Sequence, residues 1–222
     1  SDIFGKRGFY NPVNGKYIIN NERKIILEEF LSILRRNNIT NLNETYLSPD
    51  LYQQNMERIL DIKTEKNFAF GKNVVTDPTP APKYSSSGPK TLTNGVQGTQ
   101  NHKSEWLGWE NVDVSITIDL EKPTDIENVT VSTLQNLTSW ITHPVKISCL
   151  VSLDSITYSE AGIIHSDSDL RKEKDFKKFE FQLKGEKIRY IKLNVEGTKV
   201  LPKWHLYAGN KSWVFIDEII AR

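Results

Sequence analysis

The spacing of apolar and polar positions changes near residue 65, from a pattern typical of helices to one typical of strands. In residues 21–36 apolar side chains recur at helical intervals, and charged side chains fill the positions between them. This spacing predicts an amphipathic helix that Asn37 and Asn38 close. Its inward face is expected to carry Ile25, Ile26, Phe30, Ile33 and Leu34.

A second helix is expected to begin at Ser48-Pro49-Asp50 and to run to about Ile62. Ser48 is a favourable cap, Pro49 suits the first helical position, and Asp50 suits the positive end of the helix dipole. Before the two helices, residues 9–17 are predicted to form a turn between short extended pieces. The inward face of the second helix is expected to carry Leu51, Met56, Ile59 and Leu60.

After residue 66 short runs that alternate between apolar and polar residues replace the helical spacing, apart from a Pro- and Ser-rich loop at 76–89. Short alternating strands separated by turns favour an antiparallel β-sandwich. The chain is therefore predicted to be mainly β, with a sandwich over residues 67–222 and a helical N-terminal segment over residues 1–66. Strands are expected at 112–120, 126–134, 145–153, 176–183, 188–195 and 213–220.

The N-terminal segment is too short to build a sizeable core, because two helices within about 65 residues bury little apolar surface. We expect it either to pack on the sandwich or to be the tail of a larger upstream domain.

Composition narrows the classes of function. The 29 basic and 28 acidic residues give a formal net charge of +1, so no basic field exists to collect nucleic acid. No apolar run approaches the ~20 residues that span a bilayer. Cys149 is the only cysteine, so it cannot form an internal disulfide, and its alternating surroundings indicate a small core side chain.

Four segments resemble, in order, the motifs of the discoidin or coagulation factor 5/8 type C family, which overlaps the family 32 carbohydrate-binding modules. The resemblance implies a galactose-binding-domain-like jelly roll over about 155 residues, while residues 1–65 match no family we recognise. The closing segment is most similar to modules attached to bacterial exo-glycosidases such as β-hexosaminidases. The four segments are residues 92–99 with 106–109, residues 113–120 followed by Glu121 where glycine is usual, residues 140–155, and residues 188–195 with 204–219.

The same resemblance implies a structural calcium ion between the opening loop and the closing strand. Asn94 stands where the family usually has aspartate, Thr99 matches its threonine, and Glu218 matches its acidic residue. Calcium takes six to eight oxygen ligands, several of which can be neutral, but the asparagine removes one negative charge. The alternative is an empty loop held by hydrogen bonds from Asn94 and Thr99.

A sugar site needs a flat aromatic side chain for the pyranose ring and fixed polar groups for its hydroxyls. The loop 203–212 is the first candidate, with Trp204 or Tyr207 stacking and His205 and Asn210 bonding hydroxyls. The second candidate is the pair Trp106 and Trp109, on either side of a glycine that allows a tight turn. For all these side chains the alternative is structural packing, and Trp140 and Trp213, which adjoin strands, are expected in the core.

The remaining candidate groups give no catalytic pattern. His102 and His143 are loop residues of lower rank as ligand contacts, and His165 is expected in a polar surface loop. Asp217 and Glu218 are adjacent on a strand, so their side chains are expected on opposite faces and not as a glycosidase pair. No serine nucleophile elbow, zinc-protease motif or phosphate loop occurs, so we expect no enzyme activity.

The leading hypothesis is a non-catalytic carbohydrate-binding module that binds a terminal sugar of a glycan. It would belong or be attached to a secreted glycoside hydrolase, with an upstream catalytic domain, in a secreted, periplasmic or cell-surface location. Two alternatives stay open. One is a structural or docking domain without its own ligand, and the other is a protein or phospholipid adhesion domain, against which the lack of a cysteine pair counts.

Overall fold

The computed structural model describes residues 10–13, 16–19, 21–42, 48–53, 67–99, 101–103, 105–167 and 171–222. The chain divides into two compact units, Ser1–Lys66 and Asn67–Arg222, each of which is described by itself. None of the helices in the described ranges is long and apolar enough to cross a membrane.

In the first unit the short strands β1 (Tyr10–Val13) and β2 (Lys16–Ile19) pair antiparallel, which confirms the extended pieces predicted there. They are followed by helix α2 (Asn21–Arg36), which confirms the predicted bounds. The helix closes as expected, because the Asn37 side-chain amide donates a hydrogen bond to the Ile33 carbonyl at 2.8 Å. Asn38 then leaves the helix with a φ of 53°.

The predicted inward face of α2 is confirmed for Leu34, which is buried, and in part for Phe30, which is half-buried, but it is wrong for the three isoleucines. Leu27, Leu31 and Leu34 are buried, whereas Ile25, Ile26 and Ile33 are exposed. Apolar side chains surround more than half of this helix, and the leucines spaced four and three residues apart form the stripe that packs. Spacing alone could not select between the two stripes.

The second predicted helix begins as expected: residues 49–53 are helical, and the Leu51 N–H donates to the Ser48 hydroxyl at 3.1 Å. Leu51 itself is exposed, against the expectation that it faces inward. Met56, Ile59, Leu60 and the expected end at Ile62 lie outside the described residues.

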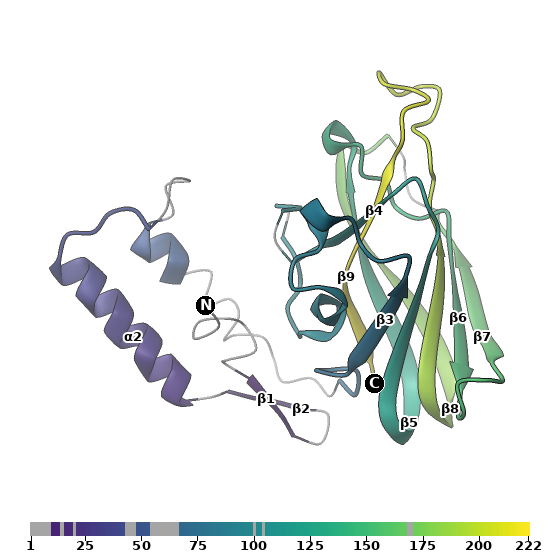
Figure 1. The fold of residues 1–222 in the computed structure, drawn as a ribbon, viewed down its shortest axis with the longest axis horizontal. Helices are drawn as coiled ribbons and strands as arrows, with labels where there is room; N and C mark the ends of the chain where they lie inside the picture. The colour runs from purple at the N-terminus through teal and green to yellow at the C-terminus, as the bar shows by residue number, and fades with distance from the viewer. Residues whose placement is uncertain are drawn as a thin grey trace. The chain divides into compact units, whose positions relative to one another are not determined.

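The second unit is an antiparallel β structure, as predicted (Figure 1). Its seven strands form one hydrogen-bonded sheet, and three 3₁₀ turns, η1 (Pro82–Tyr84), η2 (Pro89–Thr93) and η3 (Leu137–Ser139), lie in its connections. The strands are β3 (Asn73–Asp77), β4 (Leu107–Glu110), β5 (Val114–Asn136), β6 (Lys146–Ser152), β7 (Ser159–His165), β8 (Lys174–Glu196) and β9 (Trp213–Ala221).

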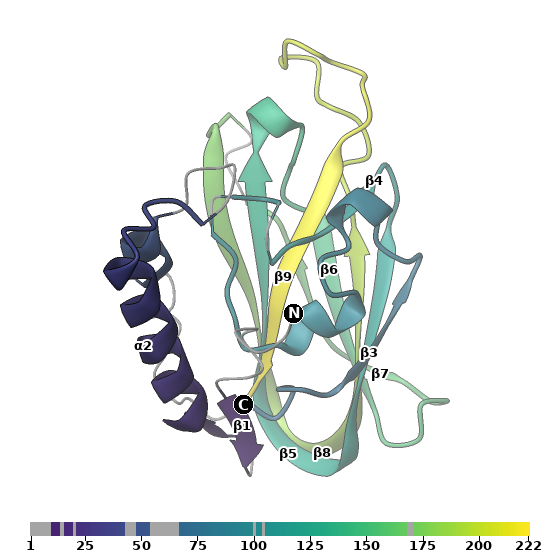
Figure 2. The same ribbon diagram turned by 60° about the vertical axis from the view of Figure 1, so that its left-hand side comes forward.

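Two long strands, β5 and β8, pair along almost their whole length and bend together (Figures 1 and 2). The prediction of two separate strands in each was wrong, because the ladder continues through the polar segment that seemed to end them. The register shifts between Asp119 and Thr124 and again between Ile126 and Asn128. Such irregularities bend and twist a strand, so they fold the ladder over without breaking it.

The bend turns one sheet into two facing layers. In the first layer β4 pairs with β9, and β9 pairs with the second half of β5, from Val129 onward. In the second layer β3 pairs with the first half of β5, while β6 pairs with the second half of β8 and with β7. The sandwich is therefore closed at one end by the folded β5–β8 ladder.

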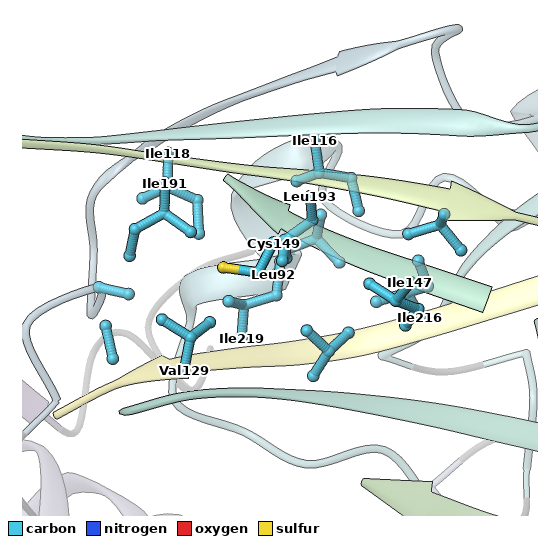
Figure 3. Packing of buried hydrophobic residues seen from close by; sticks show 14 of the residues in the cluster. Leu92, Ile116, Ile118, Val129, Ile147, Cys149, Ile191, Leu193, Ile216 and Ile219 are labelled. Atoms are coloured by element: carbon cyan, nitrogen blue, oxygen red, sulfur yellow. The ribbon is translucent and has the colours of Figure 1, made fainter. Parts of the chain in front are cut away.

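Apolar side chains fill the space between the layers (Figure 3). Ile116 and Leu193 come from the layer of β3, while Val129 and Ile219 come from the facing layer. Cys149 is fully buried among them, as expected, and burial raises the pKa of its thiol to about 12. The thiol is thus a protonated core group.

Three strands were not predicted: β3, β4 and β7. The first two are short, and β7 carries Gly162 and lacks a regular alternation. His165 is the last residue of β7, so its expected place in a surface loop was wrong, although its side chain is exposed.

We expect a chain reduced to residues 67–222 to fold by itself, because every member of its main apolar cluster lies between Ala69 and Ala221. Thermal unfolding followed by tryptophan fluorescence should show one cooperative transition, since all five tryptophans belong to this unit.

A substitution at Asn67 serves as a control that destabilises the shortened chain from within the second unit. The buried amide oxygen of the Asn67 side chain accepts hydrogen bonds from the N–H groups of Ala69 at 2.9 Å and Ala221 at 3.0 Å. Asn67→Ala in the shortened chain should lower the free energy of unfolding by about 1–3 kcal/mol, because buried donors lose their acceptor. A shortened chain that melts without cooperativity would show that the N-terminal unit completes the fold.

Candidate functional site

The loop 199–212 joins β8 to β9 and projects from the end of the sandwich opposite the β5–β8 bend (Figures 1 and 2). Its two arms are paired: Val200 bridges Lys211, and the Leu201 N–H donates to the Asn210 carbonyl at 2.8 Å. Leu201 is buried and anchors the base. The Gly209 N–H also donates to the Leu201 carbonyl at 3.0 Å, so the loop is an internally bonded hairpin.

A second segment, residues 137–143, lies against the first. Ile141 forms a bridge to Trp213, and the Trp213 N–H donates to the Trp140 carbonyl at 2.9 Å. Trp140 has a φ of 62°, in the left-handed region that bulky side chains rarely adopt. The bonds around Trp140 hold this conformation, so the placement of its side chain is fixed by the fold and not by local preference.

The two segments bring four aromatic rings together. The Trp140 and Tyr207 ring centroids are 5.5 Å apart, those of His205 and Tyr207 6.2 Å, and those of Trp204 and His205 5.9 Å. Trp204 and Tyr207 keep 42% and 50% of their surface exposed, although both are large aromatic residues. We call Trp140, Trp204, His205 and Tyr207 the loop aromatic cluster. Trp140, expected in the core, is half-buried: it packs against the buried cluster of Trp106, Ile141 and Trp213 and also contacts the Tyr207 ring.

His205 occupies a different role from the one predicted. Its Nδ1 accepts a hydrogen bond from the Tyr207 N–H at 3.1 Å, so the proton of the neutral ring lies on Nε2. Nε2 donates to the Leu137 carbonyl at 3.2 Å. Both ring nitrogens are thus used within the protein, which contradicts the expectation that His205 bonds sugar hydroxyls. His205 ties the 199–212 loop to η3 and is a positioning residue.

Asn210 lies at the end of the same loop and is exposed. Its side-chain amide donates to the Tyr207 carbonyl at 3.1 Å, and its backbone N–H donates to the same oxygen at 3.2 Å. Asn210 therefore stabilises the turn, and its role as a ligand contact stays a prediction.

The second candidate pair, Trp106 and Trp109, is wrong as a binding surface. The two side chains are only 2% and 1% exposed, and their indole N–H groups donate to the carbonyls of Thr99 at 2.8 Å and Pro78 at 2.9 Å. Gly108 lies in strand β4 and not in a turn. A Cβ on Gly108 would lie 2.7 Å from the Phe215 ring, so the glycine permits close packing under the covering segments.

The opening loop 94–99 lies against the closing strand β9. Gly95 donates its N–H to both carboxylate oxygens of Glu218 at 3.1 Å, and the Gly98 N–H donates to Asp217. The expectation that Asp217 and Glu218 point to opposite faces is therefore contradicted. The register between β5 and β9 shifts between Val131 and Thr133, opposite these residues, and such a bulge turns neighbouring side chains toward one side.

Two of the three predicted calcium ligands are brought together there. The Asn94 side-chain oxygen accepts the Val96 N–H at 2.8 Å, beside the turn that Glu218 holds. Thr99 is engaged elsewhere, since its hydroxyl accepts from the Asn101 N–H at 3.2 Å. Asp217, which sequence reasoning did not place here, adds a second buried carboxylate. In the described ranges no three His, Cys, Asp or Glu side chains form a metal-binding group.

These donors are of the types that calcium prefers. They are a neutral amide oxygen and two carboxylates, and they lie beside a loop that could add backbone carbonyls. Asn94, Asp217 and Glu218 would hold the ion, which would supply positive charge to two buried carboxylates.

His102 packs on the outer side of the first layer. Its ring centroid is 5.8 Å from that of Tyr84 and 5.9 Å from that of Phe215. Burial and the nearby Lys103 ammonium lower its pKa. His102 thus belongs to the covering of the sheet, away from the loop aromatic cluster.

No protein-family model and no curated protein matches the chain. In fold, the chain resembles carbohydrate-binding modules. One is chitosan-binding module 1, derived from a chitosanase/glucanase of Paenibacillus sp. IK-5, with 11% identity and a TM-score of 0.47 over 71% of this chain and 99% of that chain.

Two further solved structures are similar. The Clostridium perfringens module CpGH89CBM32-4, in complex with GlcNAc-α-1,4-galactose, has 16% identity and a TM-score of 0.46 over 73% of this chain and 96% of that one. The lectin domain of lectinolysin, complexed with Lewis B antigen, has 16% identity and a TM-score of 0.44 over 72% and 98%. The similarity is one of fold.

His143 is buried, which contradicts the expectation of an exposed loop residue. Its Nδ1 lies 2.8 Å from the Thr133 hydroxyl, and its Nε2 lies 3.5 Å from the Asp175 carboxylate. Burial lowers the pKa of His143 to about 4, an effect that Asp175 opposes and that Lys177 and Lys172 assist. The ring is therefore a neutral structural group, which corrects its place among the candidate ligand contacts.

The buried His143 predicts a loss of stability in acid. Its pKa in the folded chain lies below the unfolded value of 6.5, so its contribution is complete above pH 6.5 and falls as the pH drops toward about 4. The loss should be about 3 kcal/mol across this window. Urea unfolding at several pH values should show it, and His143→Gln should show a shallower pH dependence. Equal slopes for both proteins would contradict the assignment.

Proposed function

We propose that residues 67–222 are a non-catalytic carbohydrate-binding module, with the loop aromatic cluster as its binding surface. The observation that carries the proposal is the exposure of two large rings, Trp204 and Tyr207, in a loop whose own hydrogen bonds fix its shape. An aromatic ring left half in water and held in place is a platform for the apolar face of a pyranose.

The rigid support of this surface matters for its affinity. His205 and Trp140 fix the loop through contacts to η3 and β9, so little ordering remains to be done when a ligand binds. A surface with one or two stacking rings supports weak binding, in the millimolar range, which corresponds to about 4 kcal/mol. We propose a terminal sugar of a glycan as the ligand.

Weak binding is useful when it keeps an attached partner close to its substrate. A module linked to a catalytic domain raises the effective concentration of that domain on the glycan. We therefore propose that the module belongs or is attached to a secreted glycoside hydrolase, in a secreted, periplasmic or cell-surface setting. A docking domain without its own ligand is the simpler alternative.

A second candidate function is adhesion to a protein or phospholipid surface. Leu206, at the tip of the 199–212 loop, keeps 87% of its surface exposed between Trp204 and Tyr207. An exposed aliphatic side chain adds nothing to recognition of sugar hydroxyls, whereas it suits an apolar partner. Leu206→Ala separates the two functions, since it should weaken adhesion and leave sugar binding unchanged.

We predict that Trp204→Ala and Tyr207→Ala each weaken glycan binding by about 5- to 30-fold, because one stacking contact of about 1–2 kcal/mol is lost. A glycan array with the whole chain should identify the ligand, and titration calorimetry should measure the affinities. Both side chains are exposed, so the thermal unfolding of the variants should change little.

Leu153→Ala is the matched control for these two variants. Leu153 is an exposed apolar residue in the turn between β6 and β7, on another part of the sandwich. Its loss should leave binding unchanged. If the Trp204 and Tyr207 variants fold and bind as tightly as the unaltered chain, the ligand does not use this loop.

We propose further that calcium binds between the opening loop and β9 and stabilises the folded chain through Asn94, Asp217 and Glu218. What supports this is the pair of buried carboxylates that the β9 bulge turns toward the same loop. Positive charge there would offset the cost of burying two like charges. Asp217 would supply the charge that asparagine at position 94 removes.

The expected result is a higher melting temperature in millimolar calcium than in chelator. At a hundredfold excess over its dissociation constant, the ion should add about 2.7 kcal/mol of stability. Glu218→Gln should abolish the difference. Magnesium serves as the ion control, since it demands a tighter octahedral shell. Equal melting temperatures in calcium and chelator would reject the site.

A further inference from the structure

The loop aromatic cluster carries an unusual local charge. The chain as a whole is balanced, with 29 basic and 28 acidic residues, yet residues 197–212 contain Lys199, Lys203 and Lys211 and no aspartate or glutamate. The neighbouring segment 137–145, which contributes Trp140, contains no acidic residue either. These two segments therefore carry lysines and no acidic residue of their own.

The three lysines differ in their partners. Lys199 forms an ion pair with Asp113 at 2.7 Å, at the base of the loop, so its charge is compensated. Lys203 and Lys211 are exposed, and within the described part of the chain no carboxylate lies within 4.0 Å of either one. Lys146, the first residue of β6, pairs with Glu196, and Lys172, just before β8, pairs with Asp175. The uncompensated positive charge of this region thus includes the two lysines of the aromatic loop.

The positions of Lys203 and Lys211 suit one ligand together with the rings. Lys203 directly precedes Trp204, within the turn that the His205 N–H closes on the Pro202 carbonyl at 2.9 Å. Lys211 lies across from Val200 at the base of the same hairpin. An ammonium group is a mobile point charge with three donors, so it can meet a carboxylate or sulfate at the edge of a stacked sugar.

From these observations we infer that the ligand of the loop aromatic cluster is an acidic saccharide, one that carries a carboxylate or a sulfate group. The inference rests on the proposed carbohydrate-binding function and adds the chemical class of the sugar. Trp204 and Tyr207 hold the ring of the saccharide, and Lys203 and Lys211 attract and hold its anionic group. A carboxylate on the protein would repel such a ligand, and this loop has none.

The test uses pairs of saccharides that differ only in charge. Galacturonic acid against galactose forms the carboxylate arm, and galactose 6-sulfate against galactose forms the sulfate arm. The affinity of the whole chain for each is measured by ligand-observed NMR titration at low and high sodium chloride. In at least one arm the charged member should bind about three- to tenfold more tightly at low salt, and the preference should shrink in about 1 M salt.

The variants locate the effect. Lys203→Gln with Lys211→Gln should remove the preference and keep the affinity for the neutral member. Lys187→Gln, at an exposed lysine in the β5–β8 bend at the other end of the sandwich, should change nothing. Glutamine keeps the length and polarity of the side chain, so folding should be the same in all three proteins.

The outcomes separate the two proposals. If neutral and charged members bind equally and without salt dependence, the inference is overturned while carbohydrate binding stands. If the charged members bind better but the Lys203 and Lys211 double variant keeps that preference, these lysines are not the site and the inference is again overturned. If no saccharide of either kind binds, the proposed function itself fails.

Discussion

The folded ladder of β5 and β8 is the interaction on which the rest of this domain depends. Because the two strands stay paired through the bend, the same pair of chains supplies the centre of both layers. The bend of this one strand pair therefore brings the apolar faces of the two layers against each other. The strands β3, β4, β6, β7 and β9 extend the two layers sideways. The bend closes one end of the sandwich, and the loop 199–212 projects from the other end (Figures 1 and 2).

That division explains the fates of the tryptophans. Trp106, Trp109 and Trp213 belong to segments that cover the outer side of the β4–β9 layer or fill the core, and they are buried. Trp140 and Trp204 lie at the free end of the sandwich, beyond the last paired residues, and remain accessible. The sequence shows five indoles of equal chemistry, and only the topology separates structural rings from those that face solvent. Adjacent glycine was an ambiguous signal, since close packing and a tight turn both require it.

Periodicity predicted the fold class, helix α2 and most of the strands, because those features depend on local spacing and on burial of one face. It failed where the backbone departs from regular repeats. Bulges let β5 and β8 pass through apparent breaks, and a bulge in β9 brings Asp217 and Glu218 to one loop although their spacing placed them on opposite faces. Glu121 has a φ of 72°, a left-handed conformation that glycine adopts readily. This conformation explains why glycine is usual at that position in the family that the chain resembles. A single sequence with no glycine there gives no sign of that conformation.

In the candidate site, residue types alone did not show which side chains are available to a ligand. Residue types in the 199–212 loop suggested four ligand contacts, yet a polar side chain that can bond a sugar can equally bond its own backbone. His205 and Asn210 do so, and the result is a loop with a fixed shape and few polar groups left on its own hairpin. The exposed side chains of the loop include two aromatic rings, one leucine and two lysines that pair with no carboxylate of the described residues. Since His205 is already used to hold the loop, we expect stacking and long-range charge to contribute most of the selectivity at this surface.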